Sequence, residues 1–92
     1  MPPKPSLDNQ FTVDATWDDD AEVWVAESRE IPGLITEAES RVKLNKKLSG
    51  LVPELLELNG CKFDPAKPID LLIRYNRPAE KREERIRLPK AA

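Results

Sequence analysis

The sequence predicts a small α+β domain, with an antiparallel β-sheet in βββαβ order packed on one kinked helix. Residues 10–17 and 69–75 alternate apolar with polar side chains, which is the pattern of half-buried strands. Residues 42–56 instead repeat leucine and valine every three or four positions, which is typical of an amphipathic helix. A length of 92 residues leaves room for one hydrophobic core and excludes a multidomain enzyme.

The first two strands are expected to form a hairpin. Phe11, Val13, Ala15 and Trp17 share one face of the first strand. Asp18, Asp19 and Asp20 favour a turn because their side chains bond to nearby backbone. A second strand follows over residues 23–28, where Trp24 either fills the core or anchors a partner from the surface.

A tight bend and a short third strand over residues 34–38 come next. Ile31-Pro32-Gly33-Leu34 favours a bend because proline lacks an N–H donor and glycine tolerates positive φ. The bend is either a simple connection or an exposed apolar border of a partner-binding edge.

The helix is expected to begin after Ser40, a suitable N-cap, and to stop at Asn59-Gly60 in a left-handed cap. Gly50 and Pro53 lie inside it and disfavour a regular helix. The sequence therefore predicts either a kink near residues 49–52 or two short helices in series. A last strand is expected over residues 69–75.

Three segments divide the chain: a disordered leader over residues 1–9, the α+β domain over 10–76 and a charged C-terminal tail over 77–92. The leader contains three prolines and has no apolar periodicity. In the tail, residues 80–85 fit a helical turn whereas residues 85–88 alternate like an edge strand. The tail is either a solvated arm or a segment that folds on a partner and adds a strand through Ile86 and Leu88.

The composition offers little for catalysis. The chain has no histidine and one cysteine, Cys61, so the commonest general base is missing and no intramolecular disulfide can form. We expect no enzyme activity, no cofactor and no metal. Asp18 to Asp20 with Glu22 offer hard-metal ligands, but they lack calcium-loop spacing and fit a solvated turn. The sequence shows no signal peptide and no apolar run long enough for a membrane span, so we expect a cytoplasmic protein without membrane contact.

Charge is divided unevenly along the chain. The net charge of −2 combines −6 over residues 1–60, +1 over residues 61–76 and +3 over residues 77–92. An acidic body repels phosphate. The pattern therefore favours a basic protein partner over a nucleic acid.

An ordered set of short motifs between Phe11 and Gly60 resembles the HicB-like antitoxins, and most closely a short family of unknown function grouped with them. The motifs are Trp17-Asp18, Trp24, Val25-Ala26, Ile31-Pro32-Gly33-Leu34 and Thr36-Glu37-Ala38, followed by the leucine-rich helix. The resemblance implies a compact sheet with a crossing helix, described as a degraded RNase H-like or ferredoxin-like half domain. It also implies an antitoxin that neutralises a small HicA-like mRNA-cleaving toxin.

The resulting hypothesis is a non-catalytic antitoxin that covers a basic ribonuclease toxin with an acidic surface and dimerises, or forms a higher homo-oligomer, through a sheet edge. DNA binding is doubtful, because residues 85–90 look like the first strand of a ribbon-helix-helix whose two helices are missing. The residues expected at the partner-binding surface are Asp18, Asp20, Glu22, Trp24, Glu27, Ile31, Pro32, Leu34, Glu37, Ile86 and Leu88.

Two other functions remain open. One is an orphan oligomerisation or adaptor domain that uses the same scaffold for another protein. The other is a metal-dependent nuclease that retains Asp14 with Glu27 or Asp70.

Overall fold

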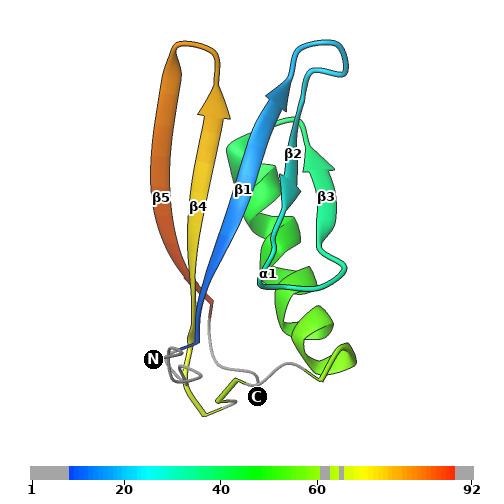
Figure 1. Cartoon of the computed structure of the whole chain (residues 1–92), viewed down its shortest axis with the longest axis vertical. Helices are drawn as coiled ribbons and strands as arrows, with labels where there is room; N and C mark the ends of the chain where they lie inside the picture. Colours follow the sequence, from blue (N-terminus) through cyan, green and yellow to red (C-terminus); the bar gives the residue numbers. More distant parts are fainter. Residues whose placement is uncertain (1–8, 61–62, 65, 89–92) are drawn as a thin grey trace.

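The computed structural model describes residues 9–60, 63–64 and 66–88. It is a two-layer α+β structure, with one five-stranded sheet and one helix packed against one of its faces (Figure 1). The elements are β1 (Gln10–Asp18), β2 (Val23–Glu27), β3 (Ile35–Ala38), α1 (Arg41–Leu58), β4 (Ile69–Arg77) and β5 (Glu80–Leu88). The predicted α+β class is thus confirmed.

The sheet is mixed, so the predicted all-antiparallel arrangement is wrong. The strand order is β3-β2-β1-β4-β5. β4 pairs with β1 in parallel, with Val13 opposite Ile73, and the other neighbours are antiparallel. The helix explains the parallel pairing of β4 with β1. α1 returns the chain to the end of the sheet at which β1 starts, so β4 runs in the same direction as β1.

A fifth strand replaces most of the predicted charged tail. β5 pairs along its whole length with β4, from Arg77↔Glu80 to Ile69↔Leu88, and Ala79 turns the hairpin with a φ of 67°. The alternation of residues 85–88 therefore predicted the structure correctly, and the helical reading of residues 80–85 is wrong. The remaining tail residues, 89–92, and residues 1–8 of the predicted leader lie outside the described residues, as does Cys61.

The core lies between α1 and the sheet face that carries Val13 and Ala15 of β1. Trp17 and Trp24 are directly opposite each other in the β1–β2 register, so both point to this covered face. Periodicity predicted that seven residues of α1 face the sheet. Leu44, Leu48, Val52 and Leu56 are buried as predicted, and Leu51 and Leu55 are partly buried against the core. The prediction is wrong for Val42, which is 71% exposed because it lies in the first turn, on the side of the helix away from the sheet.

α1 is one continuous helix, not two. Ser40 caps it, accepting a hydrogen bond from the Lys43 backbone N–H at 3.2 Å, and Gly60 follows its end with a φ of 62°, both as predicted. Pro53 lies inside the helix and leaves the carbonyl of Ser49 without its usual N–H donor. Across the described parts of the chain, no helix has the length and apolar character needed to cross a membrane.

Asn9, which the sequence placed in the leader, is buried and fastens the loop before β4. Its side-chain N–H donates to the backbone carbonyls of Asp64 at 2.7 Å and Lys67 at 3.2 Å, and its side-chain oxygen accepts from the Asp64 N–H at 2.8 Å. Asn9 is therefore part of the folded domain and not of a leader.

Candidate protein-binding surface

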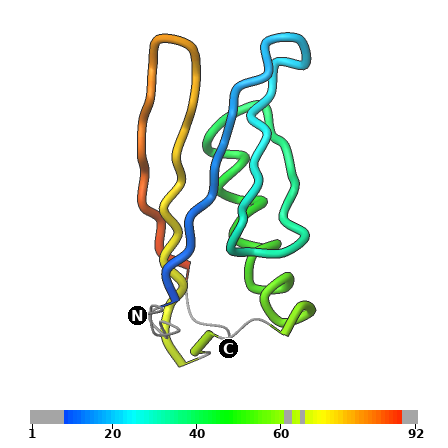
Figure 2. Tube along the Cα trace, in the orientation of Figure 1, coloured from blue at the N-terminus to red at the C-terminus, as the bar shows by residue number. Residues whose placement is uncertain are grey.

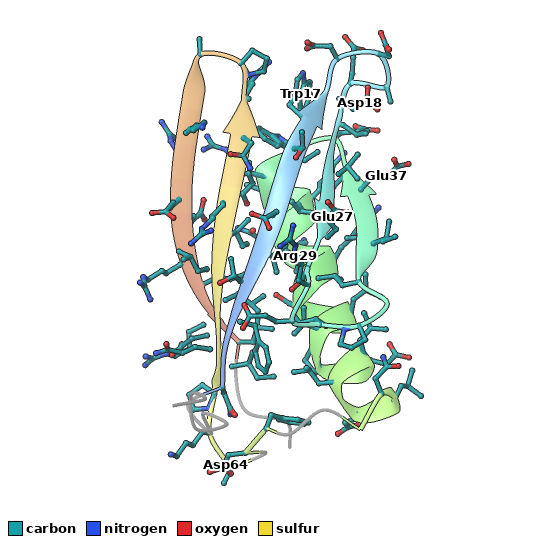
Figure 3. The ribbon with its side chains drawn as sticks, viewed as in Figure 1. Trp17, Asp18, Glu27, Arg29, Glu37 and Asp64 are labelled. Atoms are coloured by element: carbon teal, nitrogen blue, oxygen red, sulfur yellow. The ribbon has the colours of Figure 1, made fainter. Side chains whose placement is uncertain are left out.

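The second face of the sheet, which α1 does not cover, is the candidate site, and we call it the open face. Strand alternation and pairing place the following side chains on it: Thr12, Asp14, Thr16, Val23, Val25, Glu27, Ile35, Glu37, Leu72, Arg74, Asn76, Lys81, Glu83, Arg85 and Arg87. Figure 3 looks onto this face, where Glu27 and Glu37 are labelled. Ile35 is 76% exposed, an uncommon exposure for a large aliphatic strand residue.

Negative charge gathers on the β1–β2–β3 side of the open face, which we call the acidic half. Residues 10–28 contain six carboxylates and no lysine or arginine. Asp14 lies directly opposite Glu27 in the β1–β2 register, an unfavourable pairing of like charges. Within the described chain neither residue forms an ion pair, and nor does Glu37. Asp14 has Arg74 opposite it in the β1–β4 register and lines a hollow with Arg29, whereas the unpaired carboxylates of Glu27 and Glu37 favour a cationic partner.

The aspartates at the β1–β2 turn serve mainly to shape it. Asp18 accepts hydrogen bonds from the backbone N–H groups of Asp20 at 3.0 Å and Ala21 at 3.1 Å. Asp19 accepts from the indole N–H of Trp17 at 2.7 Å. Among the described residues, no group of three or more histidine, cysteine, aspartate or glutamate side chains is placed to hold a metal ion.

Two acidic residues close in sequence to the predicted partner-binding residues, Glu30 and Glu39, are engaged within the protein. The Glu30 carboxylate accepts from the Thr12 N–H at 2.8 Å, and the Ser28 hydroxyl donates to the Thr12 carbonyl at 2.6 Å. The two side chains thus provide hydrogen-bond partners for the Thr12 backbone, at the part of β1 that extends beyond the end of β2. Glu39 pairs with Lys43 at 3.2 Å. Asp18, Asp20, Glu22, Glu27 and Glu37 remain exposed, as expected for a docking surface.

Most of the predicted apolar contact residues belong to the core instead. Trp24 is 7% exposed, Ile31 0%, Leu34 2% and Leu88 3%. The predicted exposure of Ile31 and Leu34 is wrong, because the bend folds them inward while Pro32 faces solvent. Ile86 is half-buried and packs on the core from β5. Ile35, the exposed apolar residue at this edge, was missed, although its position next to Leu34 indicates that one of the two must face outward.

The β4–β5 side of the open face, the basic half, carries four cations, Arg74, Lys81, Arg85 and Arg87, and two carboxylates, Asp70 and Glu83. Arg74 pairs with Glu83 at 3.3 Å and Arg87 with Asp70 at 2.8 Å. Within the described residues Lys81 and Arg85 form no ion pair. Asp70 is thus paired with Arg87. On β4, Asp70 lies four residues before Arg74, and Arg74 is the residue opposite Asp14. The structure brings Asp14 close to Glu27 but not to Asp70.

Both hairpins turn at the same end of the molecule (Figure 2). On the covered face at this end, three aromatic rings border a cavity of about 260 Å³. Trp24 packs edge-to-face against Trp17 and Tyr75, with ring centroids 5.3 and 5.1 Å apart. Arg77 stacks over Trp17 at 4.7 Å, and Arg41 lies over Tyr75 at 5.7 Å. The arginines therefore cover the rings from the solvent side.

Comparison with known proteins gives the family. The model of the family described as "Domain of unknown function (DUF1902)" matches residues 10–84. The chain belongs to this family. It is also similar to a solved structure, the hypothetical protein TTHA1013 from the extremely thermophilic bacterium Thermus thermophilus, with 46% identity and a TM-score of 0.68 over 75% of this chain and 94% of that chain. No curated protein matches.

The DUF1902 match extends from the first residue of β1 to Glu84 in β5. It therefore includes the whole acidic half and, of the basic half, Arg74 and Lys81. The open face, apart from Arg85 and Arg87, is therefore part of the DUF1902 domain.

Proposed function

We propose that this DUF1902 protein is an antitoxin of a type II toxin–antitoxin pair, which binds a small HicA-like mRNA-cleaving toxin and neutralises it by protein contact. One observation carries the proposal: the acidic half presents exposed, unpaired carboxylates on a sheet face that no other part of the described chain covers. The motifs shared with HicB-like antitoxins support the same conclusion, and with it a degraded RNase H-like ancestry.

Charge explains how contact alone would inhibit such a toxin. A ribonuclease holds RNA through cationic side chains that contact the phosphates. Glu27 and Glu37 stand on neighbouring strands and project from the same face, so they offer carboxylates to those same cations. Ile35, opposite Glu27 on β3, adds an exposed apolar contact between them. Binding here would exclude RNA from the toxin by competition.

Growth rescue tests the proposal in cells. The protein is co-expressed with any small basic reading frame found next to its gene that arrests growth when expressed alone, and the wild type is expected to restore growth. Glu27→Lys with Glu37→Lys should abolish rescue, since like charges across an interface are strongly unfavourable. Glu54→Lys with Glu57→Lys changes the net charge equally on an exposed side of α1 and should preserve rescue. Equal rescue by both double variants would contradict a role for the acidic half.

The second candidate is an oligomerisation or adaptor domain with a different protein ligand. The basic half favours it, because an antitoxin that only contacts a basic toxin has no need for cations on the same face. A gene without a small toxin-like neighbour would support this candidate over the first.

A further inference from the structure

The two edges of the sheet are poorly suited to pairing with another molecule. β3 is four residues long, and the Lys47 ammonium from α1 donates to the Glu37 carbonyl at 2.6 Å. β5, the other edge, is made mostly of charged residues over its length. Short strands and edge charges are features that prevent strand addition. The expected dimerisation through a sheet edge is therefore disfavoured, which leaves the open face as the larger uncovered surface.

The open face is divided by charge along its central strand, β1. On one side lies the acidic half with Asp14, Glu27 and Glu37, and on the other lies the basic half with Arg74, Lys81 and Arg85. Both halves are parts of one sheet surface (Figure 3). Such a surface is complementary to itself when one copy is turned so that its acidic half meets the basic half of another.

We propose that two copies of this chain pair through their open faces, about a two-fold axis that lies in the plane of the face and runs parallel to β1. Rotation about this axis places β5 of each copy over β3 of the other, and β4 of each copy over β2 of the other. A two-fold axis perpendicular to the strands would stack acidic on acidic half, so charge selects the first arrangement.

Sheet register identifies the charges that meet. Glu37 and Lys81 lie in one row across the sheet, through Val25, Thr16 and Asn76. The rotation therefore brings Lys81 of each copy near Glu37 of the other.

The next row gives the second pair. Glu27, Asp14, Arg74 and Glu83 are neighbours in it, so Arg74 of each copy, which pairs with Glu83 of its own sheet, comes near Glu27 of the other. The two Asp14 side chains approach each other at the axis, each beside an Arg74 of its own sheet.

The shape of the molecule suits a face-to-face pair. Its principal dimensions are 38, 33 and 20 Å, so the sheet side is broad enough to bury the roughly 800 Å² per partner of a standard interface. The proposal does not rest on the antitoxin function. It does imply that a toxin bound to the acidic half competes with the second copy.

Charge exchange tests the pairing with the purified protein alone. Sedimentation equilibrium at low salt should show a dimer that weakens as salt is added. One variant carries Arg74→Glu and Lys81→Glu, and the other carries Glu27→Lys and Glu37→Lys. Each should be monomeric, with affinity reduced at least about 100-fold by repulsion in both symmetric contacts. Mixed in equal amounts, the two variants should form a heterodimer, because every reversed charge again meets its opposite.

Three outcomes would overturn the proposal: a wild type that is monomeric at low salt, double variants that remain dimeric, or a mixture that stays monomeric. The Glu54→Lys and Glu57→Lys variant is the control for net charge, and loss of its dimer would also contradict pairing through this face. Because no toxin is present, none of these results depends on the proposed antitoxin activity.

Discussion

At the scale of single residues, Tyr75 links the sheet to the helix. Its hydroxyl donates to the side-chain oxygen of Asn45 at 3.1 Å, and the Asn45 amide donates to Glu84 at 3.3 Å. The pKa of Tyr75 is raised to about 12, mainly by burial and also by the negative charge of Glu84, while the positive charge of Arg41 acts to lower it. The protonated tyrosine is therefore favoured by the folded protein.

The raised pKa of Tyr75 predicts loss of stability in alkali. Between pH 10 and about 12 the unfolded chain releases a proton that the folded chain keeps, so the free energy of unfolding falls as the pH rises. This stabilisation is fully present below pH 10. Urea midpoints measured from pH 8 to 12 should show the decline in the wild type.

Tyr75→Phe is the control for this titration. It should lower stability by about 0.5–1.5 kcal/mol at pH 8 through the lost hydrogen bond, and its further decline above pH 10 should be smaller than that of the wild type. An equal alkaline decline in both proteins would show that other groups, such as lysines, cause it.

Asn9 shows what residue patterns fail to predict. Its sequence neighbours gave no reason to place it in the core, because the hydrogen bonds that bury it join it to residues more than fifty positions away. Asn9→Ala should cost about 2–4 kcal/mol, since it removes these hydrogen bonds and places alanine at a φ of 54°.

Asn9→Gly separates the two contributions, because glycine tolerates positive φ. It should lose the hydrogen-bond contribution alone and be less destabilised than Asn9→Ala in urea unfolding. Wild-type stability in both variants would mean that Asn9 does not hold the loop.

At the scale of elements, α1 contains a position where a substitution should make the protein more stable. Gly50 is an exposed residue of the helix, and an added Cβ atom there would meet no other atom within 4 Å. Gly50→Ala should raise the free energy of unfolding by about 0.5–1 kcal/mol because alanine restricts the unfolded chain and favours a helix. The matched control is Gly33→Ala, which should be destabilising because Gly33 has a φ of 81°. Thermal unfolding that ranks the two variants in the opposite order would contradict this account of α1.

The elements that the sequence predicted are those whose own residues show a pattern. β1, β2, β3, α1 and β4 were found from alternation, periodicity and the Ser40 cap. β5 was uncertain because its charged residues have low strand propensity, and its pairing with β4 includes the Arg74–Glu83 and Arg87–Asp70 ion pairs. The parallel β1–β4 contact joins distant segments, so alternation alone could not predict it.

At the scale of the whole molecule, the sequence predicted the charge of the site better than its shape. Counting charges along the chain indicated an acidic body and a basic end, and Glu27 and Glu37 are exposed as expected. The apolar residues were assigned less well, because a hydrophobic residue in a bend has no alternation to show its face, and Ile31 and Leu34 are buried. That the basic end completes the same sheet face could be learned only from the fold.

The acidic half is the surface that we propose to neutralise a basic ribonuclease. The most direct measurement is RNA cleavage by a purified small basic protein encoded next to this gene, titrated with this chain. We predict that the wild type stops cleavage near equimolar amounts, and that Glu27→Lys with Glu37→Lys requires at least about 100-fold more. Inhibition at the same ratio by the double variant, or none by the wild type, would contradict the account.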